Sequence, residues 1–409
     1  MAFDAFKGWT KSQRHAVIAS YLGRTLDAFD FFLLVFVMVD VAKEFDVSVK
    51  DVSWAITLTL AFRALGAFVF GRLADRYGRR VVMMIDVALY ATFGFLTAFS
   101  PDIVVFLVIR ALFGIAMGGE WGVGASLTME SIPPKARGLV SGLLQAGYPS
   151  GYLLASVVYG ALYAYIGWRG MFMVGILPAF LVLYIRRYVE ESPAWRAGPA
   201  RHSKILAVLK THWRLAVYAM LFMMCMNFFS HGTQDVYPTF LKVDHGLDPR
   251  TVGTIAVIYN IGAILGGLAF GALSQRIGRR WALILGALLA LPIIPVWAFS
   301  SDIYVLAASA FAVQFMVQGC WGIIPAHLNE ISPPEARGTF PGFVYQLGNF
   351  LAAANATLQV WLAINYGTYG TALAIVAAAA ALGIAVFAYA GREAKDVDMA
   401  AARGAVSPS

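Results

Sequence analysis

The stretch GRLADRYGRR at residues 71–80 recurs in degenerate form as GALSQRIGRR at residues 271–280. Three further pairs keep the same offset of 200 positions: GEWG at 119–122 with GCWG at 319–322, PPKARG at 133–138 with PPEARG at 333–338, and Asp102 with Asp302. Four landmarks that share one offset without a gap indicate an internal duplication. The sequence therefore predicts a molecule of two related halves.

The composition indicates that both halves lie in a membrane. Of the 409 residues, 60% are hydrophobic and only 13% are charged, whereas soluble proteins carry roughly 25% charged residues. A helix that spans a lipid bilayer needs about 20 mostly apolar residues. Such runs begin near Ala16, Ser53, Val81, Ile103, Gly138, Trp168, Trp213, Thr251, Trp281, Ile303, Thr339 and Thr371. We expect an all-α membrane protein of twelve transmembrane helices, with a substrate site where the two halves meet.

The Lys and Arg residues set the expected orientation. They gather at both ends of the chain, in the 71–80 and 271–280 loops and between the halves. By the positive-inside rule this side is cytoplasmic, so both termini face the cytoplasm of a cell inner (plasma) membrane. The net charge of +8 comes from these short clusters, and we expect no nucleic-acid partner. The expected parts are an N-terminal six-helix bundle at 1–187, a cytoplasmic linker at 188–212, a C-terminal six-helix bundle at 213–392 and a cytoplasmic tail at 393–409.

The 71–80 loop resembles the signature loop of the major facilitator superfamily, which reads Gly-x-x-x-Asp-Arg-x-Gly-Arg-Arg. Arg110 with Gly114 and Gly118 resembles the fourth-span motif of that superfamily, and the ESP segment at 191–193 is similar to the one that closes the N-terminal half of many members. The resemblance implies two pseudo-symmetric six-helix bundles. Charged side chains of such a loop can pair with neighbouring helix ends and latch one side of the protein. The expected gating residues are Asp75, Arg76, Arg79, Arg80 and Arg110.

Charged residues inside the spans occur mainly in the N-terminal half. The duplication pairs Asp27 with Asn227, Asp30 with Ser230, Arg63 with Ala263, Arg110 with Ala310, and Glu120 with Cys320. A charge inside a membrane span is costly and is a functional hypothesis by default. Charged residues that only maintain the fold should occur in both halves alike. The asymmetry therefore indicates that these charges have a functional role.

Arg63 is the sharpest candidate for substrate binding. It lies about 8 residues, or roughly 12 Å of helical rise, from the loop that begins at Gly71. A guanidinium matches a carboxylate through two parallel hydrogen bonds. The alternative is a structural salt bridge from Arg63 to Glu120 or Asp30.

Acidic residues in the N-terminal half are the candidates for proton coupling. Asp27 and Asp30 share one helix face with Arg24, which we expect to neutralise Asp27 and leave Asp30 freer. Burial in an apolar bundle favours the protonated form of a carboxyl group. Asp30 and Glu120 are therefore candidate proton carriers, with a permanent ion pair as the alternative for each. Asp86 is expected only to cap the basic loop.

Residues 227–239, NFFSHGTQDVYPT, contain a polar stripe at helical spacing. Inside a membrane such a stripe should line a cavity. The stretch resembles the signature of the fungal Jen lactate/pyruvate permeases, which group with the sialate:proton symporters. That resemblance implies that Asn227, His231 and Asp235 lie along the translocation path. His231 can shuttle a proton or donate one fixed hydrogen bond to Asp235, and both readings stay open.

Amide and tyrosine side chains in other spans form a second tier of candidates. They can hydrogen-bond a hydroxyl or keto oxygen of a substrate, or they can join helices to one another. The candidate substrate contacts are Gln145, Tyr148, Gln346 and Asn349.

Taken together, these features predict a proton-coupled symporter of small monocarboxylates such as lactate or pyruvate, which works by alternating access in a lipid bilayer. The alternative is a proton-coupled transporter of sialic acid or another organic acid, and a uniporter or a receptor stays possible. The motifs of zinc proteases, serine hydrolases and phosphate-binding loops are not found in the sequence. We expect a monomer with no cofactor, no metal and no catalytic residue.

Overall fold

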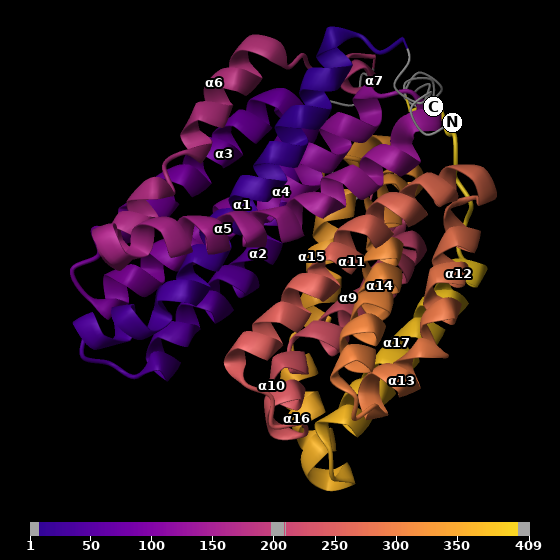
Figure 1. Cartoon of the computed structure of the whole chain (residues 1–409). Coiled ribbons are helices and arrows are strands. Elements are labelled where there is room, and N and C mark those ends of the chain that lie inside the picture. Colours follow the sequence, from indigo (N-terminus) through magenta and orange to yellow (C-terminus); the bar gives the residue numbers. More distant parts are fainter. Residues whose placement is uncertain (1–7, 198–207, 209, 400–409) are drawn as a thin grey trace.

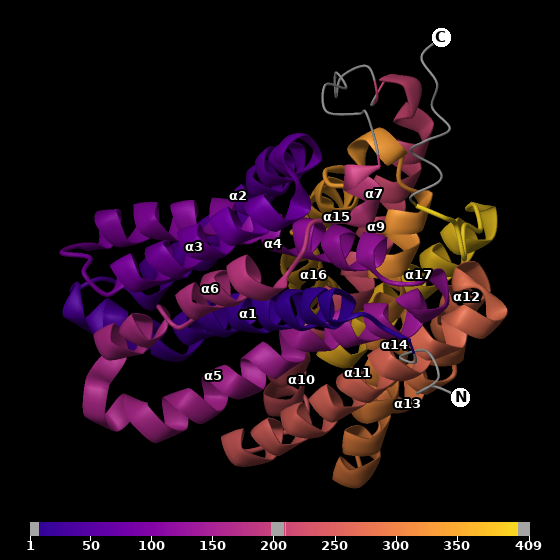
Figure 2. The same ribbon diagram turned by 90° about the horizontal axis from the view of Figure 1, so that it is seen from above.

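The computed structural model describes residues 8–197, 208 and 210–399. The helices fall into two groups that match the two halves of the duplication, and they lie side by side in both views (Figures 1 and 2). The first half contains α1 (Lys11–Glu44), α2 (Val49–Tyr77), α3 (Arg79–Thr97), α4 (Ile103–Ser131), α5 (Arg137–Val174) and α6 (Pro178–Tyr188). A short helix, α7 (Pro193–Arg196), follows.

The second half repeats this order with several broken helices. It contains α9 (Trp213–Gln234), α10 (Tyr237–Val243), α11 (Pro249–Ile277), α12 (Arg279–Ala290), α13 (Ile293–Phe299), α14 (Ile303–Ile331), α15 (Phe340–Leu351), α16 (Asn355–Tyr366) and α17 (Tyr369–Ala390). Two 3₁₀ turns, η2 (Pro134–Ala136) and η3 (Pro334–Ala336), occupy equivalent loops. The pairs α9 with α10, α12 with α13, and α15 with α16 each correspond to one expected span.

Ten segments of the described chain are long and apolar enough to cross a membrane. One of them, Pro134–Tyr188, has 55 residues and contains two expected spans, which Gly167 separates through a non-helical backbone (φ 62°, ψ −174°). The 34-residue α1 is not among the ten because Arg24, Asp27 and Asp30 lie inside it. The structure is thus consistent with twelve crossings, and α1 is the one most interrupted by charge.

The duplicated landmarks end and begin helices. Gly78 and Gly278 join consecutive helices at φ 105° and 96°, a backbone conformation that glycine adopts without a steric penalty. Asp102 and Asp302 are the N-caps of α4 and α14, where each carboxylate accepts hydrogen bonds from backbone N–H groups in the first turn. Local chain geometry therefore explains why these positions recur in both halves.

The two halves touch through small residues near the end of the molecule where both termini lie, and they diverge toward the opposite end (Figure 1). There α5 packs against α11, and α2 and α4 pack against α15. A Cβ atom built on Gly122 would lie 2.9 Å from the Cα atom of Gly342, so the backbones of α4 and α15 are in direct contact. Glycine at these positions allows the halves to close on one another.

The expected division into four parts stays a prediction. Much of the expected linker at 188–212 (residues 198–207 and 209) and the end of the expected tail (residues 400–409) lie outside the described residues.

Candidate functional site

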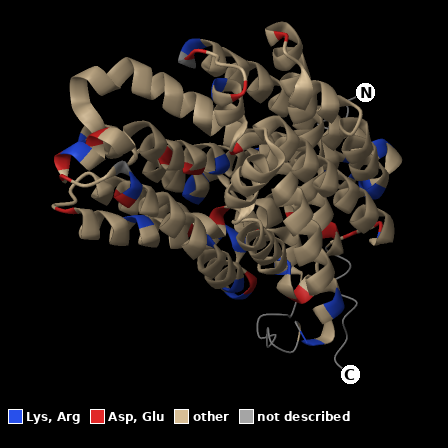
Figure 3. Ribbon diagram, turned by 90° about the horizontal axis from the view of Figure 1, so that it is seen from below, with Lys and Arg blue, Asp and Glu red and all other residues tan. Residues whose placement is uncertain are grey.

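Charged side chains converge inside the first half. Figure 3 shows Lys, Arg, Asp and Glu mostly at loops and helix ends, with a few inside the first group of helices. Arg24 on α1 forms the expected ion pair with Asp27, at 3.2 Å, and both side chains are buried. The Arg24 guanidinium also lies over the ring of Tyr148 from α5, 4.7 Å from its centre. The expectation that Arg24 neutralises Asp27 is confirmed.

Arg63 lies on α2 and is 3% exposed. Its Nε and Nη2 atoms have no hydrogen-bond partner among the described residues, and it forms no ion pair within the described part of the chain with Glu120 or Asp30. Its charge acts on Asp27, Glu120 and His231, the last of which belongs to the second half. Arg63 is therefore a buried cation with unused donors, placed between the two halves.

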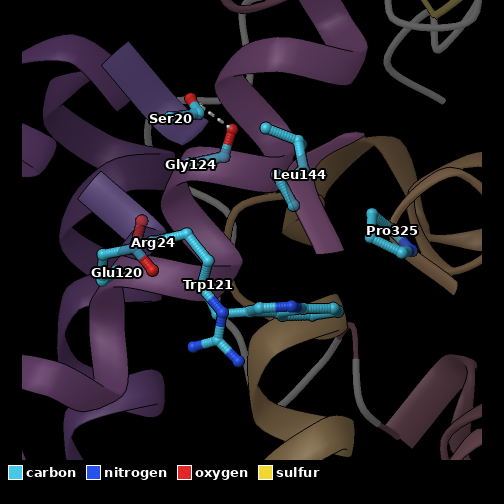
Figure 4. A pocket seen from close by; sticks show the side chains of 8 residues that line it. Ser20, Arg24, Glu120, Trp121, Gly124, Leu144 and Pro325 are labelled. Atoms are coloured by element: carbon cyan, nitrogen blue, oxygen red, sulfur yellow. Dashed lines mark hydrogen bonds between the residues drawn. The ribbon is translucent and has the colours of Figure 1, made fainter. Parts of the chain in front are cut away.

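Glu120 on α4 borders a small cavity of about 10 Å³, which is room for about one water molecule. Figure 4 shows Glu120 beside the Arg24 side chain, and Leu144 of α5 opposite Pro325 of α14. The cavity is lined by Ser20, Arg24, Glu120, Trp121, Gly124, Ala125, Leu144 and Pro325. Since Pro325 comes from the second half, the cavity lies at the junction between the halves.

Asp30 and Arg110 form a second buried charge group. Both carboxylate oxygens of Asp30 and the three guanidinium nitrogens of Arg110 lack hydrogen-bond partners in residues that the structure describes. The two charges still attract one another. Arg110 lies over the ring of Phe113, 4.1 Å from its centre, and Phe172 of α5 lies 5.7 Å away. These contacts join α4 to α5.

The expectation that Asp86 caps the basic loop is wrong. Asp86 is fully buried on α3, and neither of its carboxylate oxygens has a hydrogen-bond partner in the described chain. Asp86 lies seven residues after the helix start at Arg79, and its side chain faces α4 instead of the loop. Closeness in sequence to the loop therefore did not predict the direction of the side chain. Its own face of α3 also carries Tyr90, whose hydroxyl group is buried without a described partner.

A hydrogen-bonded polar network occupies the second half. His231 contacts Asp235 through Nδ1 at 3.1 Å and Asn349 through Nε2 at 3.0 Å. Asp235 also accepts a hydrogen bond of 3.2 Å from Asn355, which contacts Gln359. The His231 and Asp235 side chains are 36% and 34% exposed, and polar groups inside a span face water or protein rather than lipid. The network thus marks a water-accessible wall of the second half.

The polar stripe of residues 227–239 belongs only partly to one helix. α9 ends at Gln234 and α10 begins at Tyr237, so the helix is interrupted after Gln234. The Gln234 amide N–H₂ donates hydrogen bonds to Ser230 and to Gln314. Asn227 is buried, and its amide donates to the Met223 carbonyl of its own helix. The structure brings His231, Asp235 and Asn349 together and leaves Asn227 apart from their hydrogen bonds.

The remaining amide candidates differ in how they are used. Gln145 accepts a hydrogen bond of 3.3 Å from the indole of Trp121, whose ring lies 4.8 Å from that of Tyr345 in the second half. Gln346 is buried, and both of its amide atoms lack partners within the described ranges. Gln346 is therefore the amide with the most unused hydrogen-bonding capacity. Asn355 and Gln359 were not predicted, although their i, i+4 spacing in a span could have revealed them.

The expected gating loop joins the two halves. Asp75 on α2 accepts hydrogen bonds from the Gly338 N–H at 2.7 Å, the Thr339 N–H at 3.0 Å and the Thr339 hydroxyl at 2.6 Å. At the equivalent place of the other half, Gln275 accepts a hydrogen bond of 3.1 Å from the Gly138 N–H across the junction and one of 3.0 Å from Arg279 of its own half. The contacts are reciprocal under the duplication, but only the first uses a charged group.

Arginines brace each side of this contact. Arg79 pairs with Asp75 at 3.1 Å and with Glu130 at 3.0 Å, and Arg279 pairs with Glu330 at 2.9 Å. Arg80 donates to the Arg186 carbonyl at 2.5 Å and so ties the loop to α6. Arg76 is exposed and lies over the Tyr77 ring, 5.1 Å from its centre. Asp75, with Arg79 beside it, therefore joins the two halves on the side of the termini, in a contact that we term the latch.

Structural repeats of membrane-spanning helices, with a site where the repeats meet, are a feature of secondary transporters. The sequence profile of the Major Facilitator Superfamily matches residues 20–234 and 220–406, and the chain belongs to that family. It is a multi-pass membrane protein and not an enzyme. The family membership that the 71–80 loop implied is confirmed.

Two curated relatives are similar over most of the chain. A "Carboxylic acid transporter protein homolog" of Saccharomyces cerevisiae is 31% identical over 368 residues, which is 83% of this chain. The chain spans 59% of the length of that yeast protein. The "Sialic acid transporter NanX" of Escherichia coli is 27% identical over 385 residues, with 93% of this chain and 94% of the relative covered.

A solved structure supports the fold. The proton:xylose symporter XylE superposes with a TM-score of 0.74 and 18% sequence identity, over 94% of this chain and 97% of that one. This likeness confirms the all-helical architecture.

Proposed function

We propose that the protein is a proton-coupled symporter that carries small monocarboxylates, such as lactate or pyruvate, by alternating access. The observation that carries this proposal is Arg63, whose guanidinium is buried between the halves with unused donors. A desolvated guanidinium binds a carboxylate through paired charge-assisted hydrogen bonds. The similarity to a yeast carboxylic acid transporter homolog supports the same substrate class.

The wall opposite Arg63 offers hydrogen bonds for the rest of the substrate. The charge of Arg63 reaches His231, which is held by Asp235 and Asn349. A hydroxyl or keto oxygen beside the carboxylate meets His231, Asn349 or the free amide of Gln346. Gln145, Tyr148 and Asn227 line or support this space in our proposal. A single cation and a few neutral donors favour a small anion with one charge.

Proton coupling needs a carboxylate that can be neutralised while substrate is bound. Four acidic residues are proposed for this role: Asp27, Asp30, Glu120 and Asp235. Asp27 has a firm partner in Arg24, whereas Asp30 and Glu120 keep carboxylate oxygens without described partners. A buried carboxylate without a partner is costly while charged, so Asp30 and Glu120 are the stronger candidates.

The latch is the proposed gate of the transport cycle. With the terminal side in the cytoplasm of a plasma membrane, the closed Asp75 contact describes a state that is shut to the cytoplasm. Substrate and proton enter from the opposite side, the halves rock, and the latch opens to release both. The gating residues Asp75, Arg76, Arg79, Arg80 and Arg110 and a monomeric functional unit are part of this proposal.

Transport of sialic acid is the second candidate. The similarity to NanX runs over nearly the full length of both chains, and the unpaired amide of Gln346 can bind a sugar hydroxyl. A sialic acid also carries one carboxylate, so Arg63 serves either substrate.

The test is uptake of labelled lactate into proteoliposomes with and without an inward proton gradient. Arg63→Gln should lose gradient-driven uptake, because a buried carboxylate–guanidinium contact is worth about 3 kcal/mol, or about two orders of magnitude in affinity. Arg63→Lys is the matched control that keeps the charge and loses the paired hydrogen bonds, and its affinity should fall between parent and Arg63→Gln. Lactate uptake by Arg63→Gln at the parental rate refutes the proposal. Uptake of sialic acid but not lactate by the parent selects the second candidate.

A further inference from the structure

The Asp86 carboxyl group on α3 packs against α4 beside Glu120, and the charge of Glu120 acts on it. A Cβ atom built on Gly119 would lie 2.6 Å from Oδ1 of Asp86, so the Asp86 carboxyl group packs on the residue next to Glu120. Both Asp86 oxygens and Oε2 of Glu120 lack hydrogen-bond partners within the described residues. On its other side, Oε1 of Glu120 lies 2.9 Å from the Cβ position of Gly23 on α1. Helices therefore enclose both groups.

The duplication provides an internal control for this contact. Positions 86 and 120 correspond to Gly286 and Cys320. A Cβ atom built on Gly286 would lie 2.7 Å from Sγ of Cys320, so positions 286 and 320 meet in the second half. There the contact consists of a glycine and a thiol, which need no charge compensation. The carboxyl pair is thus an addition to a packing contact that the fold can make without it.

The charges around the pair are unevenly placed. Arg24 and Arg63 act on Glu120, together with Asp27. The charged groups that act on Asp86 are Glu120 from α4 and Asp27 from α1, both acidic. From its own helix, Tyr90 adds only a neutral hydroxyl group. Helix α2, which packs on the same side, contributes the apolar Phe70. Helices α5 and α6 contribute no described charge that acts on Asp86. Glu120 therefore has cations nearby and Asp86 has none.

Two carboxyl groups on neighbouring helices that act on one another cannot both be ionised in an apolar bundle, because like charges repel and desolvation penalises each of them. The stable arrangement is one proton held by the pair, with Arg24 and Arg63 offsetting the single remaining negative charge. This arrangement depends on Arg63. A carboxylate ligand that binds Arg63 offsets part of the Arg63 charge, so that less of it remains to offset the negative charge of the pair.

We propose that Asp86 and Glu120 form a carboxyl pair that takes up a second proton when a substrate carboxylate occupies Arg63, and releases it when the substrate leaves. This inference rests on the proposed function. The proton comes from water through the cavity that Glu120 borders, and it binds a carboxylate oxygen of the pair. Substrate and proton then enter as a neutral set, so that the N-terminal half carries no unbalanced charge while the halves rock. Asp86 is thus the partner that makes the protonation of Glu120 depend on substrate binding.

The experiment measures protons taken up on lactate binding to the purified full-length protein, by calorimetry in two buffers of different ionisation enthalpy. The parent should take up protons, while Asp86→Asn and Glu120→Gln should bind lactate with that uptake lost. Asp102→Asn is the matched control, because Asn caps a helix as well as Asp does and Asp102 lies outside the pair. A double variant, Asp86→Gly with Glu120→Cys, copies the second half and guards against misfolding of a single variant. Parental proton uptake in Asp86→Asn and Glu120→Gln overturns the inference.

A measurement without substrate separates this inference from the proposed function. Infrared difference spectra of the ligand-free parent should contain the carbonyl band of a protonated carboxyl group, and Asp86→Asn should lose it. If the parent binds no lactate but shows this band and its loss, the proposed substrate is wrong and the pair is supported. If the band is the same in the parent and in Asp86→Asn, the pair is refuted whatever the substrate is.

Discussion

Asp75→Asn tests the latch between the halves. The Asp75 carboxylate accepts three hydrogen bonds from Gly338 and Thr339 across the junction, at 2.6 to 3.0 Å. An amide keeps one acceptor oxygen, places an N–H₂ group against the Thr339 N–H, and removes the charge that Arg79 contacts at 3.1 Å. Since hydrogen bonds to a charged group contribute about 1.5–3 kcal/mol and neutral ones about 1 kcal/mol, the closed state should lose about 2–4 kcal/mol. The ratio of open to closed molecules should rise by about 30-fold to 700-fold.

A single cysteine reports the open population. Val140 on α5 is fully buried beside Ala326 of the second half, so Val140→Cys should react slowly with an impermeant thiol reagent while the latch is closed. The two native cysteines, Cys225 and Cys320, are buried and are replaced in the background chain. When opening is fast relative to alkylation, the reaction rate follows the open population. Asp75→Asn should therefore accelerate alkylation from the terminal side in inverted vesicles.

The second half supplies the matched control for this experiment. Gln275 makes the equivalent contact with one neutral hydrogen bond of 3.1 Å to the Gly138 N–H. Gln275→Ala should lose about 1 kcal/mol, which corresponds to roughly a five-fold rise in alkylation. Equal rates in the two variants, or no change in a folded Asp75→Asn protein, would refute the view that the charged contact holds the closed state.

Three further substitutions follow from close contacts and strained positions. Gly122→Val should place a side chain against the backbone of α15, prevent closure of the latch and raise alkylation of Val140→Cys. His231→Asn should remove the 3.1 Å contact with Asp235, so that proton-driven accumulation of lactate in proteoliposomes falls by a larger factor than lactate exchange does; equal loss of both would contradict this. Gly78→Ala should destabilise the protein by about 1 kcal/mol or more, because φ is 105° and the Cβ atom meets Glu191. Gly246→Ala, at φ 64° with open space, is its control in thermal unfolding.

The sequence was sufficient to predict features that depend on local pattern. Apolar run length predicted the spans, and the repeated Asp102 and Asp302 proved to be helix caps. The Arg24–Asp27 pair followed from helical spacing and is present at 3.2 Å. Such features need only a few consecutive residues, so the sequence contains the information for them.

Features that depend on helix rotation and on contacts between distant segments could not be predicted. Asp86 lies close in sequence to the basic loop, but the face of α3 that carries it turns toward α4, where Glu120 lies. The contact between His231 and Asn349 joins residues 118 positions apart, and no pattern in either span encodes the pairing. The break within the eleventh span could not be predicted, because no proline lies near residues 352–354. In the seventh and ninth spans Pro238 and Pro292 lie near the change, but neither proline determines where the helix stops.

The asymmetry of the two halves has a physical reason in this arrangement. A buried charge is tolerated when opposite charges lie within the same rigid unit, because that compensation does not change as the halves move. Arg24, Asp27, Arg63 and Glu120 act on one another from α1, α2 and α4 of the first half. The second half meets them with His231, which contacts Asp235 of the same half at 3.1 Å, and with neutral amides, which can form and break hydrogen bonds at small cost. If the cations lay on one half and the anions on the other, each rocking motion would separate charges in a medium of low dielectric constant. Keeping the charges in one half leaves only the substrate carboxylate and its proton to change the charge balance during the cycle.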